Sequence, residues 1–207
     1  MNETRPTWTP PPEKEIVNGL RIGDEATRED RAKRFQFILS EFGPDAHMLL
    51  VGGVPAMFAI HELKRSFIDG NYLATIVTAQ AFVEHSLGGS FSMAGEDAIV
   101  NSGFARLIDE SLAREWVSPE LALRLHTLRE MRNPYTHPKI GVPGKGYMER
   151  LMKAPVPDPE TMAEQDAREA VRIVIDWLRD GSPDWAPRTV GQPWPESSEE
   201  ASETDST

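Results

Sequence analysis

The sequence predicts an all-α fold. Six segments repeat apolar residues at the three- and four-residue spacing of an amphipathic helix, and no segment alternates as a half-buried strand does. Glycine and proline pairs separate these segments. The length of 207 residues favours one domain with flanking tails. We expect a proline-rich N-terminal segment at 1–23, a helical domain at 24–180 and an acidic, disordered tail at 181–207.

The first three helices are expected before the middle of the chain. Each one ends where glycine, with proline, asparagine or a second glycine beside it, interrupts the periodic pattern. The predicted ranges are 24–42, 55–69 and 72–87, and the stops are Gly43-Pro44, Gly70-Asn71 and Gly88-Gly89.

Three further helices are expected at 103–114, 119–132 and 160–179. Ser118 followed by Pro119 is a typical helix start, because the serine side chain can cap the first turn and proline fits within it. The last segment has the broadest apolar stripe, which runs from Ala163 to Leu178. We expect Asp166 to lie mostly outside that stripe.

Composition limits the function classes. The chain has no cysteine and a formal net charge of −11. Thiolate chemistry and disulfides are therefore excluded, and a protein that coats nucleic acid by bulk charge is disfavoured. The first residues lack the order of a secretory signal, and no apolar run is long enough to cross a membrane. These features predict a cytoplasmic protein that needs no membrane.

The charge is unevenly distributed. Residues 119–153 carry seven bases and three acids, a local excess of four positive charges, whereas the last ten or so residues are strongly acidic. The bases include Arg129, Lys139 and Lys145, which we expect to contact an anionic substrate. A phosphate-binding loop at 141–146 is not supported, because the glycine and lysine spacing is wrong and no strand precedes it.

Two helices place polar side chains among apolar ones. Gln80 and Glu84 fall on the apolar face of the helix expected at 72–87, and Arg132 falls on the inner face of the one expected at 119–132. A carboxylate that faces the core needs a donor. We therefore expect an ion pair between Glu84 and Arg132.

The segment from Arg132 to His137, which reads Arg-Asn-Pro-Tyr-Thr-His, contains the main functional signal. An arginine can bind a phosphate through two hydrogen bonds, and a histidine can exchange a proton near neutral pH. Pro134 and Pro138 predict that the helix ends near Arg132 and that His137 lies on the following turn. This pairing favours phosphodiester chemistry without a metal or another cofactor.

Together these features resemble the HEPN superfamily. The resemblance is carried by the helix with Glu84, the helix that ends in Arg132-Asn133 and His137, and a final alanine-rich helix. It covers roughly residues 55–179. It implies a HEPN-like bundle of about six helices, and in many members the activity is that of a metal-independent endoribonuclease, often a toxin or a defence effector.

The resemblance assigns roles to individual residues. His137 would act as general base or acid, Arg132 would stabilise charge on the phosphate and Asn133 would orient the site, with Glu84 and Tyr135 in support. It also implies a homodimer in which two motifs meet, an RNA substrate, and an antidote or other partner protein. Two other interpretations stay open, namely a non-catalytic HEPN-like module that binds a nucleotide or a protein, and a plain helical protein.

Overall fold

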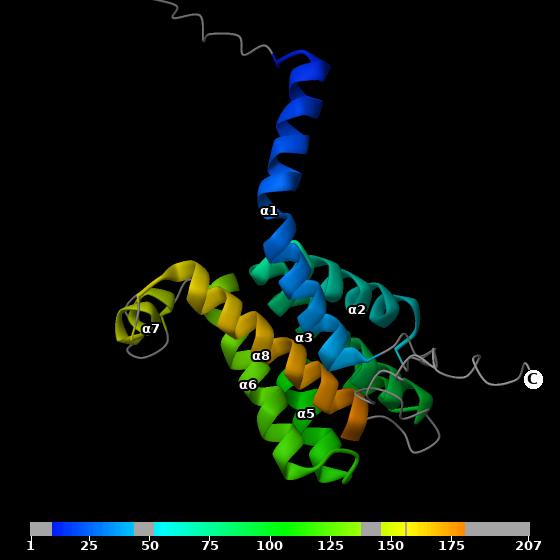
Figure 1. Cartoon of the computed structure of the whole chain (residues 1–207). Helices are drawn as coiled ribbons and strands as arrows, with labels where there is room; N and C mark the ends of the chain where they lie inside the picture. The colour runs from blue at the N-terminus through cyan, green and yellow to red at the C-terminus, as the bar shows by residue number, and fades with distance from the viewer. Residues whose placement is uncertain (1–9, 44–51, 138–145, 156, 181–207) are drawn as a thin grey trace, which may run out of the picture.

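The computed structural model describes residues 10–43, 52–137, 146–155 and 157–180, and these residues form an all-α structure (Figure 1). The predicted fold class is confirmed, since no strand occurs among them. The helices are α1 (Glu13–Phe42), α2 (Gly53–Ile68), α3 (Tyr72–Met93), α4 (Asp97–Val100), α5 (Phe104–Ala113), α6 (Pro119–Thr136), α7 (Tyr147–Lys153) and α8 (Pro159–Asp180). Two short helices, α4 and α7, are thus added to the six expected. The tail at 181–207 lies outside the described residues.

The helix α3 lies at the centre of the bundle. It packs against α2, α8, α4, α6 and α5, and its side chains Ile76, Phe82 and Val83 are fully buried. Burying this many apolar groups is the main stabilising contribution to the fold. These five helices therefore surround α3.

The C-terminal third of α1 docks on this bundle. Arg34 Nε donates a hydrogen bond of 2.9 Å to the carbonyl of Ile68, and the ring of Phe37 lies 5.1 Å from that of Phe67. The guanidinium of Arg168 stacks over Phe37 at 4.6 Å. The N-terminal part of α1 stands clear of the other helices (Figure 1).

Three predicted helix ends were wrong. The helix α1 begins at Glu13 instead of residue 24, and α3 continues through Gly88 and Gly89 to Met93. Glycine weakens a helix only by about 1 kcal/mol, and burial of Leu87 and Phe91 outweighs that cost. Prolines and glycines are therefore weaker stops than the sequence pattern indicated.

The third error concerns α6, which was expected to end near Arg132 but continues through Pro134 to Thr136. Proline removes one backbone hydrogen bond. Two contacts of the next residue offset this loss, because Tyr135 donates a hydrogen bond to Asp166 and packs its ring 5.2 Å from that of Tyr147. The predicted start was right, since the Ser118 side chain accepts from the N–H of Leu121 at 3.1 Å.

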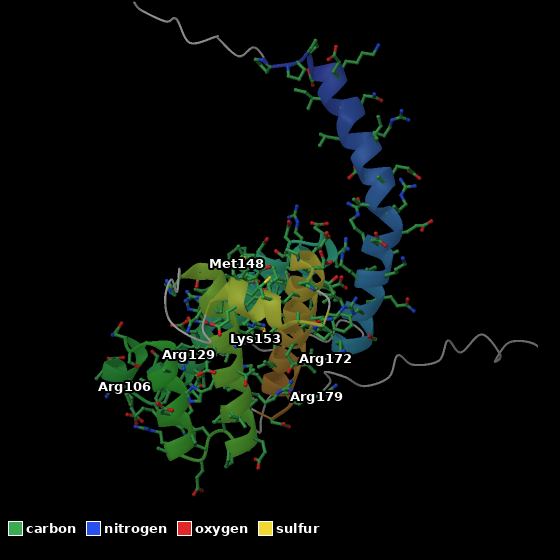
Figure 2. The ribbon with its side chains drawn as sticks, turned by 90° about the vertical axis from the view of Figure 1, so that its left-hand side faces the viewer. Arg106, Arg129, Met148, Lys153, Arg172 and Arg179 are labelled. Carbon is green, nitrogen blue, oxygen red and sulfur yellow. The ribbon has the colours of Figure 1, made fainter. Side chains whose placement is uncertain are left out.

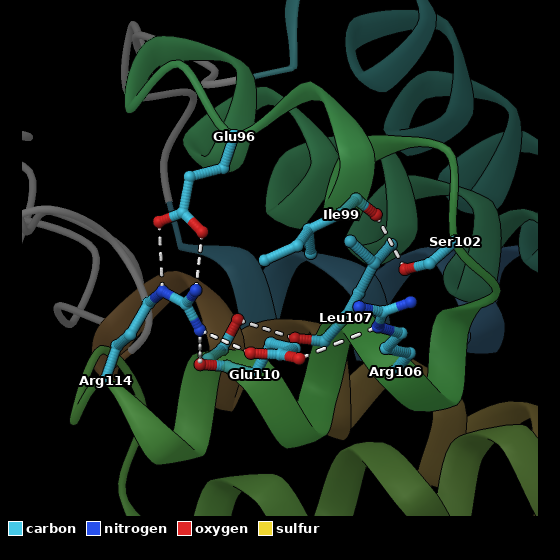
Figure 3. A network of polar contacts seen from close by, with 8 residues as sticks. Glu96, Ile99, Ser102, Arg106, Leu107, Glu110 and Arg114 are labelled. Atoms are coloured by element: carbon cyan, nitrogen blue, oxygen red, sulfur yellow. Dashed lines mark hydrogen bonds and ion pairs between the residues drawn. The ribbon is translucent and has the colours of Figure 1, made fainter.

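One charged network is centred on Arg114 at the end of α5 (Figure 3). Arg114, which follows α5, donates to both carboxylate oxygens of Glu96 and also to Glu110 at 2.6 Å. Its guanidinium lies 5.2 Å from the centre of the Phe91 ring. The bond from Arg114 lowers the pKa of Glu110. This network joins the turn after α3 to the end of α5.

Candidate functional site

The Arg-Asn-x3-His motif occupies the C-terminal end of α6. Arg132 and Asn133 lie within the helix and are half-buried, whereas His137 caps the helix and is exposed. The His137 N–H donates to the Asn133 carbonyl at 2.9 Å, which closes the last turn. Because α6 continues past Pro134, His137 directly follows that helix, one turn beyond Asn133.

The structure brings the side chains of Arg132 and His137 together. Arg132 Nη1 lies 3.0 Å from His137 Nε2. A guanidinium has only donors, so Nε2 accepts this hydrogen bond and carries no proton in this arrangement. A cation and an unprotonated imidazole nitrogen therefore lie side by side at an exposed helix end.

The charge on Arg132 is not neutralised by a carboxylate. Across the described ranges no Asp or Glu oxygen lies within ion-pair distance of it, and its Nε is buried without a hydrogen-bond partner. By contrast, Arg124 on the same helix pairs with Glu169 at 3.1 Å and with Asp176 at 2.6 Å. Arg132 is thus available to an anion, whereas Arg124 is already paired.

Arg129 lies three residues before Arg132, and therefore on the same side of α6. Its only carboxylate contact within the part of the chain that the structure describes is a 3.5 Å approach to the exposed Glu130. Figure 2 shows Arg129 on the same face of the molecule as Lys153 of α7. The other two expected substrate contacts, Lys139 and Lys145, lie outside the described residues.

The expected ion pair between Glu84 and Arg132 does not form. Glu84 is half-buried and accepts a hydrogen bond of 3.2 Å from Gln80, one turn earlier on α3. Among the residues that are described, Arg132 makes its side-chain contact with His137 instead. The prediction failed because helical spacing gives the face on which a residue lies but not its height against the neighbouring helix.

A buried carboxylate that sequence reasoning placed elsewhere holds the last turn of α6. Asp166 of α8 is only 9% exposed. It accepts a hydrogen bond of 2.8 Å from the Tyr135 hydroxyl, and Arg150 of α7 donates to both its oxygens at 2.9 Å. Asp166 thereby joins α6, α7 and α8 beside the motif.

This role of Asp166 left a signal in the sequence. The residue lies three positions after Ala163 and four before Ala170, which places it on the same face as both alanines. Like Glu84, Asp166 is an acid on an apolar face and therefore requires donors. Tyr135, expected to support the motif, is one of the two donors.

Replacing Tyr135 with phenylalanine should change the response to alkali. Burial, followed by the nearby Asp166 carboxylate, raises the pKa of Tyr135 well above its ordinary value of about 10. The unfolded chain then loses the phenolic proton first, so stability should fall as the pH rises beyond about 10. In Tyr135→Phe the free energy of unfolding should be about 1 kcal/mol lower at neutral pH, and it should fall less steeply above pH 10. Urea unfolding at several pH values measures both, and an unchanged alkaline slope would contradict this assignment.

The described helices contain no group of three or more His, Asp or Glu side chains placed to hold a metal ion. Within those same residues, no helix has the length and apolarity that a membrane span requires. Comparison of the chain with models of protein families, with curated proteins and with solved structures gave no significant match.

Proposed function

We propose that the chain is a metal-independent endoribonuclease of the HEPN type. The observation that carries this proposal is the 3.0 Å contact between Arg132 Nη1 and His137 Nε2 at an exposed helix end. The two groups supply what RNA cleavage by transesterification needs, namely a proton acceptor for the ribose hydroxyl and a fixed cation for the phosphate.

In the proposed reaction His137 Nε2 takes the proton of a ribose 2′-hydroxyl. The 2′-oxygen then bonds to the adjacent phosphorus, and the bond from phosphorus to the 5′-oxygen of the next nucleotide breaks. That leaving oxygen takes a proton from a second, protonated imidazole, and the products are a 2′,3′-cyclic phosphate and a 5′-hydroxyl. Arg132 stabilises the negative charge that develops on the phosphate oxygens.

One imidazole cannot be base and acid at the same moment. A dimer that brings two His137 rings to one phosphate would divide the two tasks, as the resemblance to HEPN proteins implies. Asn133 would orient the motif, and Arg129, one turn before Arg132 and only weakly paired with Glu130, would contact a neighbouring phosphate. A role as a toxin or defence effector with an antidote protein belongs to the same proposal.

The test is cleavage of RNA by the purified full-length chain in the presence of excess EDTA. The substrates are a mixed-sequence labelled RNA and the same RNA with 2′-deoxyribose at every position. We expect cleavage of the first only, and fragments that end in a 2′,3′-cyclic phosphate. Absence of any cleavage over a broad set of RNAs would refute the nuclease proposal and favour a non-catalytic module.

A further inference from the structure

The N-terminal part of α1 forms an uncovered arm, defined as residues 13–33. Every residue from 10 to 30 is exposed, and the arm projects from the bundle in both views (Figures 1 and 2). Large apolar side chains lie open on it, with Ile16 45%, Val17 58% and Leu20 66% exposed. A monomer would leave this apolar surface in water.

Such an arm is not a stable helix by itself. In proteins most of the stability of a helix comes from packing of its apolar face, and each interior glycine costs about 1 kcal/mol relative to alanine. The arm contains two, Gly19 and Gly23, and its ion pairs are exposed. Its helical state therefore requires a partner surface.

The arm has one continuous stripe suited to another helix. The stripe recurs at spacings of three and four residues and consists of small or apolar side chains together with one threonine. These residues are Ile16, Gly19, Leu20, Gly23, Ala26 and Thr27. The next position on this face is Asp30, which pairs with Lys33 at 3.0 Å. Beyond it lie Arg34 and Phe37, the side chains by which α1 contacts the bundle. The arm thus extends a packing face beyond the body of its own chain.

We propose that two copies of this chain pair through their arms, antiparallel, with Gly23 of each copy at the crossing point. Residue 23 is the midpoint of 13–33, so residue 33 of one copy lies level with residue 13 of the other. Arg34, the first side chain bonded to the bundle, then falls level with Pro12, beyond the start of the partner helix. The two bundles therefore lie at opposite ends of the pair and do not collide.

The charges at the two ends of the arm complement each other in this arrangement. Glu13 and Glu15 flank the stripe at the N-terminal end, and Arg31 and Lys33 flank it at the other. In an antiparallel pair the two acids of one copy lie beside the two bases of the other, on matching sides. Neither acid makes an ion pair within the described part of the chain, and the bases have only exposed contacts at 3.6 and 3.0 Å within their own helix.

This inference does not rest on the nuclease proposal. Because it separates the two bundles by the length of the arms, about 30 Å at 1.5 Å per residue, it describes a contact distinct from any that would join two His137 rings. A two-fold pair of this kind is isologous, which means that the same surface serves both copies. Charge reversal at one end therefore disrupts both ends of the pair at once.

The experiment uses full-length variants and the mass in solution from light scattering, at low salt. The first variant is Glu13→Lys with Glu15→Arg, and the second is Arg31→Glu with Lys33→Glu. Each alone places like charges together at both ends, so we expect half the mass of the wild-type assembly. Mixing the two variants restores complementary charges at both ends. One copy of each should then pair, and the mass should return to that of the wild-type assembly.

The matched control is Lys14→Glu with Arg21→Glu, which makes the same change of net charge as the second variant but on the side of α1 opposite the stripe. It should keep the wild-type mass. A wild-type chain that stays monomeric at about 100 μM, which corresponds to a contact weaker than roughly −5.5 kcal/mol, would overturn the proposal. So would charge-reversed variants that keep the full mass, since the contact would then lie elsewhere. His137→Ala should not change the mass, which separates this test from that of the nuclease.

Discussion

Replacing His137 with alanine is expected to reduce the rate of RNA cleavage by about 10²- to 10⁴-fold, the usual contribution of a general acid or base. The side chain is exposed and follows the last residue of α6, so its removal should leave the fold intact. Cleavage rates in EDTA at saturating RNA measure the effect, and circular dichroism melting verifies the fold. The loss should appear in kcat, because the ring takes part in proton transfer in the transition state and adds little to substrate binding.

His126 supplies the matched control for this substitution. It lies on α6, and its side-chain contact among the described residues is with the exposed Asp109, at 3.0 Å. His126→Ala should therefore cleave at the wild-type rate. If His137→Ala retained full activity while the wild-type chain cleaved RNA, the cleavage would come from a different site, and the role proposed for the motif would be wrong.

Replacing Asp166 with alanine should lower the free energy of unfolding more than replacing any other carboxylate of α8. The substitution removes the acceptor of both Tyr135 and Arg150 from a buried position. We expect a loss of about 2–3 kcal/mol in the free energy of unfolding, because two half-buried donors lose their acceptor at once. For a chain of this size that corresponds to a fall in Tm of roughly 5–10 °C.

Asp176→Ala is the comparison, since Asp176 also lies on α8 and also pairs with an arginine of α6. Its bond to Arg124 is short, at 2.6 Å, but both side chains are about one third exposed. Water therefore replaces much of the lost contact, and the cost should stay below about 1 kcal/mol. Hydrogen exchange adds a local test, because only Asp166→Ala should accelerate exchange in the last turn of α6 and in α7. Equal losses of stability in the two variants would contradict the burial argument.

Local spacing was sufficient to predict most of the fold. The apolar periodicity located all six long helices, and the Ser118 cap gave the start of α6. It could not predict where helices continue, because continuation past Gly88 or Pro134 depends on tertiary contacts formed by Phe91 and Tyr135. The short helices α4 and α7 have too few residues to show a period.

The candidate site was predictable only in part. Arg132 and His137 were named together from their types and spacing, and they do lie in contact. The expected partner of Arg132 was wrong, because Gln80 satisfies Glu84 within α3. Asp166 was missed because its donors come from two other helices, and a single sequence gives no register between helices.

The contact between Arg132 and His137 has a consequence for the free protein. Nε2 has one lone pair, and the guanidinium already occupies it. While that bond persists, the ring cannot collect a proton through this nitrogen. A phosphate that arrives at Arg132 competes for the same N–H groups and draws them away from the imidazole. In the proposed reaction Nε2 would thus become able to accept a proton only after the RNA phosphate has bound to Arg132, so that binding of RNA itself prepares the base.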